Sequence, residues 1–235
     1  MPDYRNIKLK LDNLDIYYPL SKKVKLLRRI SMRYFKGRLL DVGCGEMPYK
    51  NTVLENKTIN EYVGIDIKSD IYQKNSQPDL YWDGQSLPIE NNKFDCALLI
   101  EVLEHVPKPE IVLKEICRVL HKDGYLAITV PFLWNLHDVP NDEYRYTPFA
   151  LKRILEDSGF EVVELEAIGS WHASLAIMMG IYCRRALKGR KRYFTSLIFK
   201  PIIKFLHKKD ERMGKIDFTK NQMITGLWCV AKPMV

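Results

Sequence analysis

The chain has 235 residues, 46% of them hydrophobic, and a formal net charge of +8, which fits one globular domain, or one domain with an elaboration, around a substantial core. It opens Met-Pro-Asp-Tyr-Arg-Asn without an apolar signal sequence, and its longest nearly apolar run, residues 173–183, is too short to span a bilayer. Five scattered cysteines without a Cys-x-x-Cys pair argue against a disulfide frame or a zinc site, so we expect reduced thiols in a cytoplasmic protein.

The positive charge is concentrated in one segment. Residues 180–220 contain 13 of the 37 Lys and Arg residues but only three of the 29 acidic residues. This segment therefore carries a net charge of +10, and the rest of the chain carries −2. The basic character needs a local explanation.

Residues 1–36 precede the first predicted strand. Within them, residues 22–35 place Val24, Leu27, Ile30 and Tyr34 near one helical face and Lys and Arg side chains on the other. This pattern predicts a helix that either caps the domain with its lysines in water or helps to close a ligand pocket.

A strand that ends in two glycines follows, in residues 38–45, Arg-Leu-Leu-Asp-Val-Gly-Cys-Gly. Gly43 and Gly45 let the backbone turn sharply and approach a ligand, and the helix expected next would present unpaired N–H groups to it. Residues 61–67 predict a second strand that delivers Asp66, which lies 23 residues after Gly43, near the spacing at which an acid reaches a ribose hydroxyl. Pro48 stands where a dinucleotide site would have its third glycine, so a nicotinamide cofactor is disfavoured.

The middle of the chain continues the alternation of strands and helices. Residues 79–82 predict a short third strand before the turn at Asp83 and Gly84, and residues 94–100 a central buried strand that delivers Glu101. A helix is expected at residues 109–121 and a fifth strand at residues 125–130.

The loop 132–147 is polar, aromatic and longer than usual, which is typical of a binding loop. Arg145 is suited to a substrate phosphate or carboxylate and the neighbouring tyrosines to a ring, although pairing of Arg145 with Asp142 or Glu143 would order the loop instead. Thr147 is the predicted N-cap of a helix that ends at Gly159.

The C-terminal part contains two predicted strands, residues 160–167 and 224–231, separated by a basic insertion. In the insertion, apolar residues recur at helical spacing beside Lys200, Lys204 and Lys208, and Pro201 is expected to kink or split the helix. This amphipathic segment suits an anionic membrane surface, nucleic acid, or a lid that packs on its own domain with its lysines in water.

Taken together, Leu40-Asp41-Val42-Gly43-Cys44-Gly45, Val63-Gly64-Ile65-Asp66, Trp82-Asp83-Gly84 and the run from Phe94 to Val106 resemble the class I S-adenosylmethionine-dependent methyltransferases. The resemblance implies a doubly wound α/β fold with a mostly parallel, Rossmann-like sheet of seven strands in the order 3-2-1-4-5-7-6. It implies an N-terminal helical cap (1–36) and a methyltransferase domain (37–235) that carries the basic helical insertion at about 168–223.

The resemblance also implies the cofactor, S-adenosylmethionine, with S-adenosylhomocysteine as its product. In the family, the residue that corresponds to Asp41 helps to hold the aminoacyl end of the cofactor. The residue that corresponds to Asp66 binds the ribose, and the one that corresponds to Asp83 binds the adenine. The cofactor-binding residues expected from it are Asp41, Gly43, Cys44, Gly45, Asp66, Ile67, Asp83, Gly84 and Glu101.

The expected reaction is direct displacement, with His105 or His137 as a general base if the acceptor is an oxygen. The Tyr-Arg-Tyr-Thr-Pro segment resembles a subgroup of methyltransferases associated with glycan and lipid pathways. We therefore expect a small-molecule or lipid- or glycan-linked acceptor that contacts Tyr144, Arg145 and Tyr146, with peripheral membrane contact through residues 180–220 at the inner face of the membrane.

Two alternatives remain open. The basic insertion could serve an RNA methyltransferase, although Ile-Glu-Val-Leu-Glu-His at 100–105 is not the Pro-Pro-aromatic motif of enzymes that methylate nucleic-acid amino groups, so nucleic acid is disfavoured. A non-catalytic binding module with the same fold is the other alternative. No metal-ligand cluster at recognisable spacing occurs, so we expect no metal. The oligomeric state is not predicted.

Overall fold

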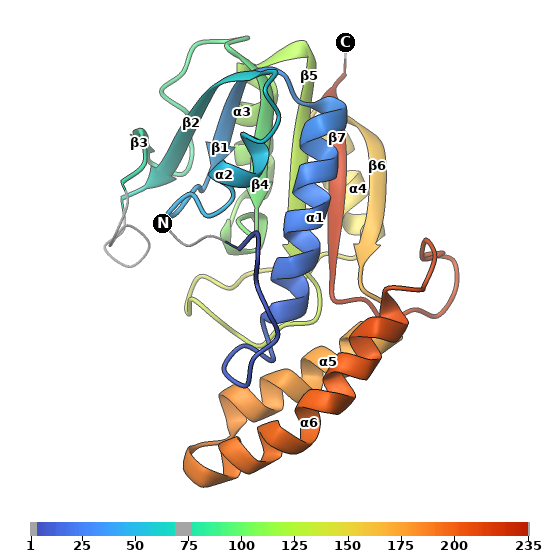
Figure 1. Cartoon of the computed structure of the whole chain (residues 1–235). Coiled ribbons are helices and arrows are strands. Elements are labelled where there is room, and N and C mark those ends of the chain that lie inside the picture. The colour runs from blue at the N-terminus through green and yellow to red at the C-terminus, as the bar shows by residue number, and fades with distance from the viewer. Residues whose placement is uncertain (1–3, 69–76, 235) are drawn as a thin grey trace.

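Seven strands form one sheet in the order β3-β2-β1-β4-β5-β7-β6 (Figure 1). The structure is a computed structural model that describes residues 4–68 and 77–234. The strands are β1 (Gly37–Val42), β2 (Ile59–Ile67), β3 (Leu80–Trp82), β4 (Phe94–Ile100), β5 (Leu120–Pro131), β6 (Phe160–Ile168) and β7 (Gly226–Pro233). Strands β3, β2, β1, β4 and β5 pair in parallel, and β7 pairs antiparallel with both β5 and β6. The predicted fold and strand order are confirmed.

Both faces of the sheet are covered, because alternate residues of each buried strand point to opposite sides. On one side, helix α1 (Tyr17–Tyr34) packs through Val24, Leu27 and Ile30 against a cluster that includes Leu39 and Leu98. Helix α1 begins five residues earlier than the predicted helix.

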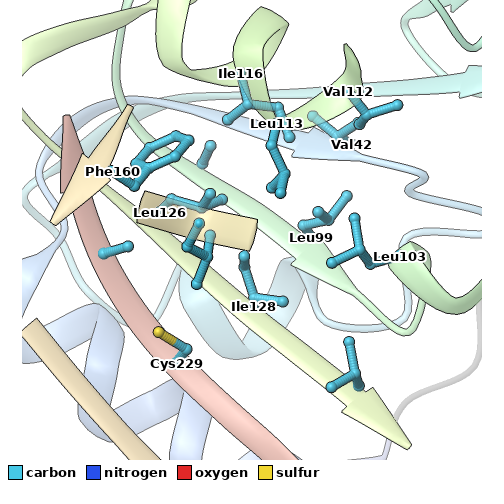
Figure 2. Close-up of a cluster of buried hydrophobic side chains, with 14 of the residues drawn as sticks. Val42, Leu99, Leu103, Val112, Leu113, Ile116, Leu126, Ile128, Phe160 and Cys229 are labelled. Carbon is cyan, nitrogen blue, oxygen red and sulfur yellow. The ribbon is translucent and has the colours of Figure 1, made fainter. Parts of the chain in front are cut away.

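On the opposite side, α3 (Pro109–Val119) and α4 (Pro148–Asp157) cover the main hydrophobic core. Figure 2 shows Val112, Leu113 and Ile116 of α3 above Leu99 and other sheet residues of this core. Helix α4 begins as predicted, because the Thr147 side chain accepts a hydrogen bond from the Ala150 N–H. Helix α3 ends two residues before the predicted end, and β5 begins at once at Leu120.

The segment after β1 departs from the prediction. Only a four-residue helix, α2 (Lys50–Val53), forms where a full helix was expected directly after the glycines. Met47 has a left-handed φ of 52°, so the chain turns again between Gly45 and α2. The N–H groups offered at this edge are therefore those of the turn itself, not those of a long helix N-terminus.

The basic insertion forms two adjacent helices, α5 (Trp171–Ile181) and α6 (Gly189–Asp210), joined through the π-helical turn η2 (Tyr182–Ala186). They lie side by side beyond the carboxyl ends of the parallel strands (Figure 1) and bury a shared cluster that includes Ala176, Ile203 and Leu206. Of the two expectations for Pro201, a kink or a split, the split is wrong, because α6 runs through it without a break, and the kink stays a prediction. In residues 4–68 and 77–234, no helix is long and apolar enough to cross a bilayer.

Candidate active site at the carboxyl edge of the sheet

The turn after β1 is held to the end of β2 by one carboxylate. Asp66 accepts hydrogen bonds from the Gly45 N–H and from the Ile67 N–H, both at 2.7 Å. An ionised carboxylate has about four acceptor positions, so each oxygen keeps capacity for a further donor such as a ribose hydroxyl. The residue predicted to bind ribose is therefore placed beside the glycine turn.

The two glycines of this turn meet different surroundings. Gly43 has φ +70°, and a Cβ built on it would lie 2.4 Å from Val102 Cγ2. Gly45 has φ +51°, and such a Cβ would meet no atom of the described residues within 4 Å. Gly43 is thus required by packing, whereas Gly45 leaves open space in which a ligand can approach the backbone.

The acid that ends β1 is buried. Asp41 is 3% exposed and accepts a hydrogen bond from the Tyr62 hydroxyl. Burial raises the pKa of Asp41 to about 7, and the hydrogen bond from Tyr62 opposes this rise. A ligand cation near Asp41 would favour the ionised form. The predicted role of Asp41 at the aminoacyl end of the cofactor stays a prediction.

Cys44, between the two glycines, is also buried, and this burial raises the pKa of its thiol. Its N–H donates to the carbonyl of Ile65, so it fixes the turn to β2. Its predicted contact with the cofactor stays a prediction.

The turn that is predicted to bind the adenine of the cofactor is exposed. Asp83 Oδ1 accepts the N–H groups of Gln85 and Ser86, each at 2.8 Å, which lowers the pKa of Asp83. This is an Asp-Gly turn stabilised by its own side chain. Gly84 lies beside Ile67, whose side chain is 46% exposed at the end of β2. An exposed apolar side chain next to a glycine suits the face of a flat base.

Glu101 follows β4 at the same edge and pairs with a lysine from α1. Lys23 Nζ lies 3.0 Å from Glu101 Oε2, and Thr129 donates to Glu101 Oε1 at 2.9 Å. Lys23 is 6% exposed, so the expectation that the lysines of this helix are solvated is wrong at this position. A lysine on the polar side of an amphipathic pattern gives no signal that distinguishes a buried ion pair from a solvated charge.

The two predicted general bases come together. The rings of His105 and His137 lie 4.7 Å apart between centroids, edge to face. His105 Nδ1 is 2.8 Å from the carbonyl oxygen of Asn141, and His137 Nδ1 is 3.3 Å from Asp142 Oδ2. Because the carbonyl and carboxylate oxygens can only accept hydrogen bonds, each Nδ1 carries the proton. In the neutral rings, each Nε2 is therefore a hydrogen-bond acceptor.

The tyrosines and the arginine of the loop are more constrained than predicted. Arg145 forms a bidentate ion pair with Asp142, at 2.6 and 2.8 Å, which is the loop-ordering alternative. Tyr146 is 6% exposed, belongs to the main core, and donates to the Leu103 carbonyl. In this conformation it packs instead of presenting a ring to substrate. Tyr144 is 38% exposed, and its hydroxyl donates to the Pro107 carbonyl.

A cavity of about 210 Å³ opens beside Glu101. Its walls come from the start of α1, the end of β5, the following loop and α5, and most of them are apolar; they include Leu20, Val130, Trp134 and Ile177. Lys23 and Glu101 form its charged part. The cavity thus connects the end of β4 with the basic helices.

These observations fit a nucleoside with a positively charged amino-acid tail. Gly45 leaves room at the backbone, Asp66 keeps capacity for hydroxyl donors, and Asp41 gains from a nearby cation. This agreement rests on the glycine turn after β1 and on Asp41 and Asp66, which the sequence predicted at this edge of the sheet.

Comparison with known proteins agrees with this description. A family model described as a methyltransferase domain matches residues 17–165, more than half of the chain. A fatty-acid O-methyltransferase from Mycolicibacterium smegmatis is 29% identical over 99 residues, which cover 39% of this chain and 36% of that protein. The chain spans less than half the length of the curated relatives it matches.

Solved structures are similar in fold at low sequence identity. The 4+2-cyclase SpnF has a TM-score of 0.60 and 19% identity, covering 92% of this chain and 82% of that chain. Phosphoethanolamine N-methyltransferase 2 from Haemonchus contortus, in complex with S-adenosylmethionine, has a TM-score of 0.56 and 15% identity, covering 94% and 54%. The family match, the strand order and the glycine turn together establish that this chain belongs to the class I S-adenosylmethionine-dependent methyltransferases, whose cofactor is S-adenosylmethionine.

Proposed function

We propose that the protein transfers a methyl group from S-adenosylmethionine to an oxygen of a small-molecule or lipid- or glycan-linked acceptor. The observation that carries this proposal is the largely apolar cavity beside Glu101, which adjoins the cofactor edge and reaches α5. A partial match to a fatty-acid O-methyltransferase is consistent with an apolar acceptor.

When bound, the cofactor supplies an activated methyl group that an acceptor oxygen takes by direct displacement. The residues of the chain hold the two reactants in line, which is where most of the rate enhancement of such a reaction arises. Asp66 would hold the ribose and Asp41 the aminoacyl end. His105 and His137 would take the proton of an acceptor hydroxyl at Nε2, because the Nδ1 of each ring lies beside a carbonyl or carboxylate oxygen to which it donates its proton.

The test is to incubate the full chain with labelled S-adenosylmethionine and separate lipid, sugar-nucleotide, RNA and protein fractions. Label is expected in a lipid or lipid-linked glycan fraction, or in a small molecule. Alkaline and acid stability of the label would then separate a methyl ester from a methyl ether. Exclusive labelling of RNA would contradict the proposal and favour the RNA methyltransferase alternative, and no labelling with intact cofactor binding would favour a non-catalytic module.

The helices α5 and α6 support a second part of the proposal, peripheral contact with an anionic membrane. Residues 171–209 contain ten Lys and Arg residues and no Asp or Glu. Large apolar side chains are at least 50% exposed on the same two helices: Trp171, Leu175, Met178, Tyr193, Phe194, Ile198 and Phe205. Basic residues beside exposed aromatic and aliphatic side chains match a bilayer surface, where each basic residue contributes about 1 kcal/mol.

Membrane contact would explain why the cavity reaches α5, since a lipid-linked acceptor could pass from the bilayer into the site. Co-sedimentation with vesicles of phosphatidylglycerol and phosphatidylcholine tests it. The full chain is expected to bind these vesicles, to bind less at high salt, and to ignore phosphatidylcholine alone. The double variant Phe194→Asp, Ile198→Asp should lose binding.

The matched control is Phe149→Asp, because Phe149 is 63% exposed on α4, outside the basic helices. This variant should bind vesicles as the parent protein does. Equal loss in both variants, or binding of RNA at physiological salt without vesicle binding, would overturn the membrane assignment.

A further inference from the structure

The side chain of one buried acid, Glu104, has no hydrogen-bond partner among the described residues. Glu104 is 0% exposed, and neither of its carboxylate oxygens is hydrogen-bonded within the part of the chain that the structure describes. Burial, and then the nearby Glu101, raise the pKa of Glu104 well above its ordinary value. A buried carboxylate without donors is costly, so such a group in a folded protein calls for a ligand or a functional role.

Two imidazoles, those of His105 and His137, lie near this carboxylate. His105 Nε2 lies 3.7 Å from Glu104 Oε1, which is too long for a hydrogen bond. Glu104, His105 and His137 each offer a ligand atom, and these atoms all lie within 4.8 Å of one another. Two atoms bound to one tetrahedral ion at about 2.1 Å lie about 3.4 Å apart, so a small contraction of this group would close it around a cation.

The outer contacts of both rings have the form found in metal sites. A histidine ligand almost always donates its second ring N–H to a carbonyl or a carboxylate, which fixes the tautomer and the ring orientation. His105 has the Asn141 carbonyl in this position, and His137 has Asp142, which is itself held by Arg145. Asp138 Oδ2, 3.8 Å from His105 Nε2, is available as a further oxygen ligand.

We propose that Glu104, His105 and His137 bind a first-row transition-metal dication at the acceptor side of the site. Two imidazoles and one carboxylate suit Zn²⁺, Co²⁺, Fe²⁺ or Ni²⁺ better than Mg²⁺ or Ca²⁺, which prefer oxygen ligands. The sequence expectation of no metal rested on spacing, and spacing could not reveal this group, because the loop fold brings residue 137 to residues 104 and 105.

The role of the cation rests on the proposed function, whereas its binding does not. A dication at this position would hold the acceptor hydroxyl and lower the pKa of that hydroxyl, so its proton passes to water as the oxygen takes the methyl group. The two histidines then act as ligands instead of proton acceptors.

The experiment uses the full chain after removal of metal with a chelator. Co²⁺ is titrated in the absence of cofactor and acceptor, with visible absorption and calorimetry as readouts. The parent protein is expected to bind one Co²⁺, which Zn²⁺ displaces. Glu104→Gln and His137→Ala should each weaken binding by more than about 10-fold, since even outer contacts of a metal site are worth about 10- to 100-fold.

The matched control is His121→Ala, because His121 is exposed and outside the group. It should bind Co²⁺ as the parent protein does. Thermal unfolding adds a readout that a purely structural role would not give: metal-free Glu104→Gln should be no less stable than the metal-free parent, while added Zn²⁺ should raise the melting temperature of the parent only.

Absence of one-to-one binding of Co²⁺ and Zn²⁺, or equal binding by Glu104→Gln, would overturn the metal site. Because the titration contains no cofactor and no acceptor, failure of the methyl-transfer assay leaves its outcome untouched. A protein that binds the metal but labels no fraction would contradict the proposed function alone.

Discussion

The parts of the sheet edge that we propose to bind the cofactor and the acceptor, here the cofactor side and the acceptor side, are built in different ways. On the cofactor side, backbone turns directly after β1 and β2 make the site, as in the bond from the Gly45 N–H to Asp66. On the acceptor side, side chains from distant segments meet through tertiary packing: Lys23 of α1 pairs with Glu101 after β4, and Glu104 lies near His137 of the loop after β5. Substitutions on the two sides should therefore separate cofactor binding from stability and acceptor chemistry.

The two glycines give the largest expected separation. Gly43→Ala places a Cβ against Val102 in a left-handed conformation, so the free energy of unfolding should fall by about 3 kcal/mol. Gly45→Ala meets open space and should lose only about 1 kcal/mol, but its methyl group would occupy the cofactor's approach. Denaturant unfolding and calorimetry with S-adenosylhomocysteine measure both effects.

If Gly45→Ala instead kept the parent affinity for S-adenosylhomocysteine, the open space beside Gly45 would not be where the cofactor lies. If Gly43→Ala folded with unchanged stability, the contact with Val102 would not restrict the turn.

Asp66→Ala tests the cofactor side through a charged group. Loss of a carboxylate that accepts ribose hydroxyls should cost about 2–3 kcal/mol of binding free energy, roughly a 30- to 150-fold weaker affinity for S-adenosylhomocysteine. Asp217→Ala, at an exposed acid outside the site, serves as the control and should bind normally. Affinity within twofold of the parent would contradict the assignment of Asp66.

Arg145→Ala tests the acceptor side. The Asp142 side chain is 2% exposed, so removal of its bidentate partner should lower the free energy of unfolding by about 2 kcal/mol. Affinity for S-adenosylhomocysteine should stay unchanged, because the pair lies in the loop after β5. Arg153→Ala, at an exposed arginine of α4, should alter neither quantity. A matching loss of cofactor affinity in Arg145→Ala would show that the two sides are not separable.

The last effect concerns pH. The pKa of Asp41 is about 7 in the folded protein, above the value of about 3.9 in an unfolded chain. Between these values the folded state holds a proton that the unfolded state has released, so this group's contribution to stability is present at low pH and is lost as the pH rises through 7. The free energy of unfolding should fall by up to about 1.4 kcal/mol per pH unit across this range.

Cofactor affinity should change in the opposite direction, because an ionised Asp41 would attract the cationic tail more strongly than the neutral form would. Affinity for S-adenosylhomocysteine should rise as the pH increases through about 7, and Asp41→Asn should remove both slopes. A parent protein with flat profiles of stability and affinity would contradict the assigned ionisation.

The cofactor side could be predicted from the sequence because its signals are local. Gly43, Gly45 and Asp66 follow strands that can be recognised in the sequence by their apolar runs. Parallel strands bring their carboxyl ends to one edge of the sheet, independently of the conformation of the loops. The strand order followed from the resemblance of these motifs to a family. The short α2 was missed because an apolar pattern does not specify how many residues a turn takes before a helix begins.

The acceptor side could be predicted only in part. The loop 132–147 was recognised by its length and polarity, but its internal pairing was not resolved, and Tyr146 packs in the core although its neighbours are polar. Lys23 and Glu104 gave no signal, because a charged residue in a helix or a turn is usually solvated. Their burial is a property of how α1 and the loop pack on the sheet.

The ion pair between Lys23 and Glu101 joins two segments that lie 78 positions apart in the chain. A substitution at one of the two positions therefore changes which residues the other position tolerates. Loss of the Glu101 charge alone would leave Lys23, whose side chain is 8% exposed, buried without its partner at a cost of about 3–5 kcal/mol, whereas simultaneous replacement of both residues by apolar ones can be neutral. Homologous chains should consequently contain the lysine and the glutamate together. Loss of activity in a Glu101 variant could then result from displacement of helix α1 as well as from loss of a cofactor contact.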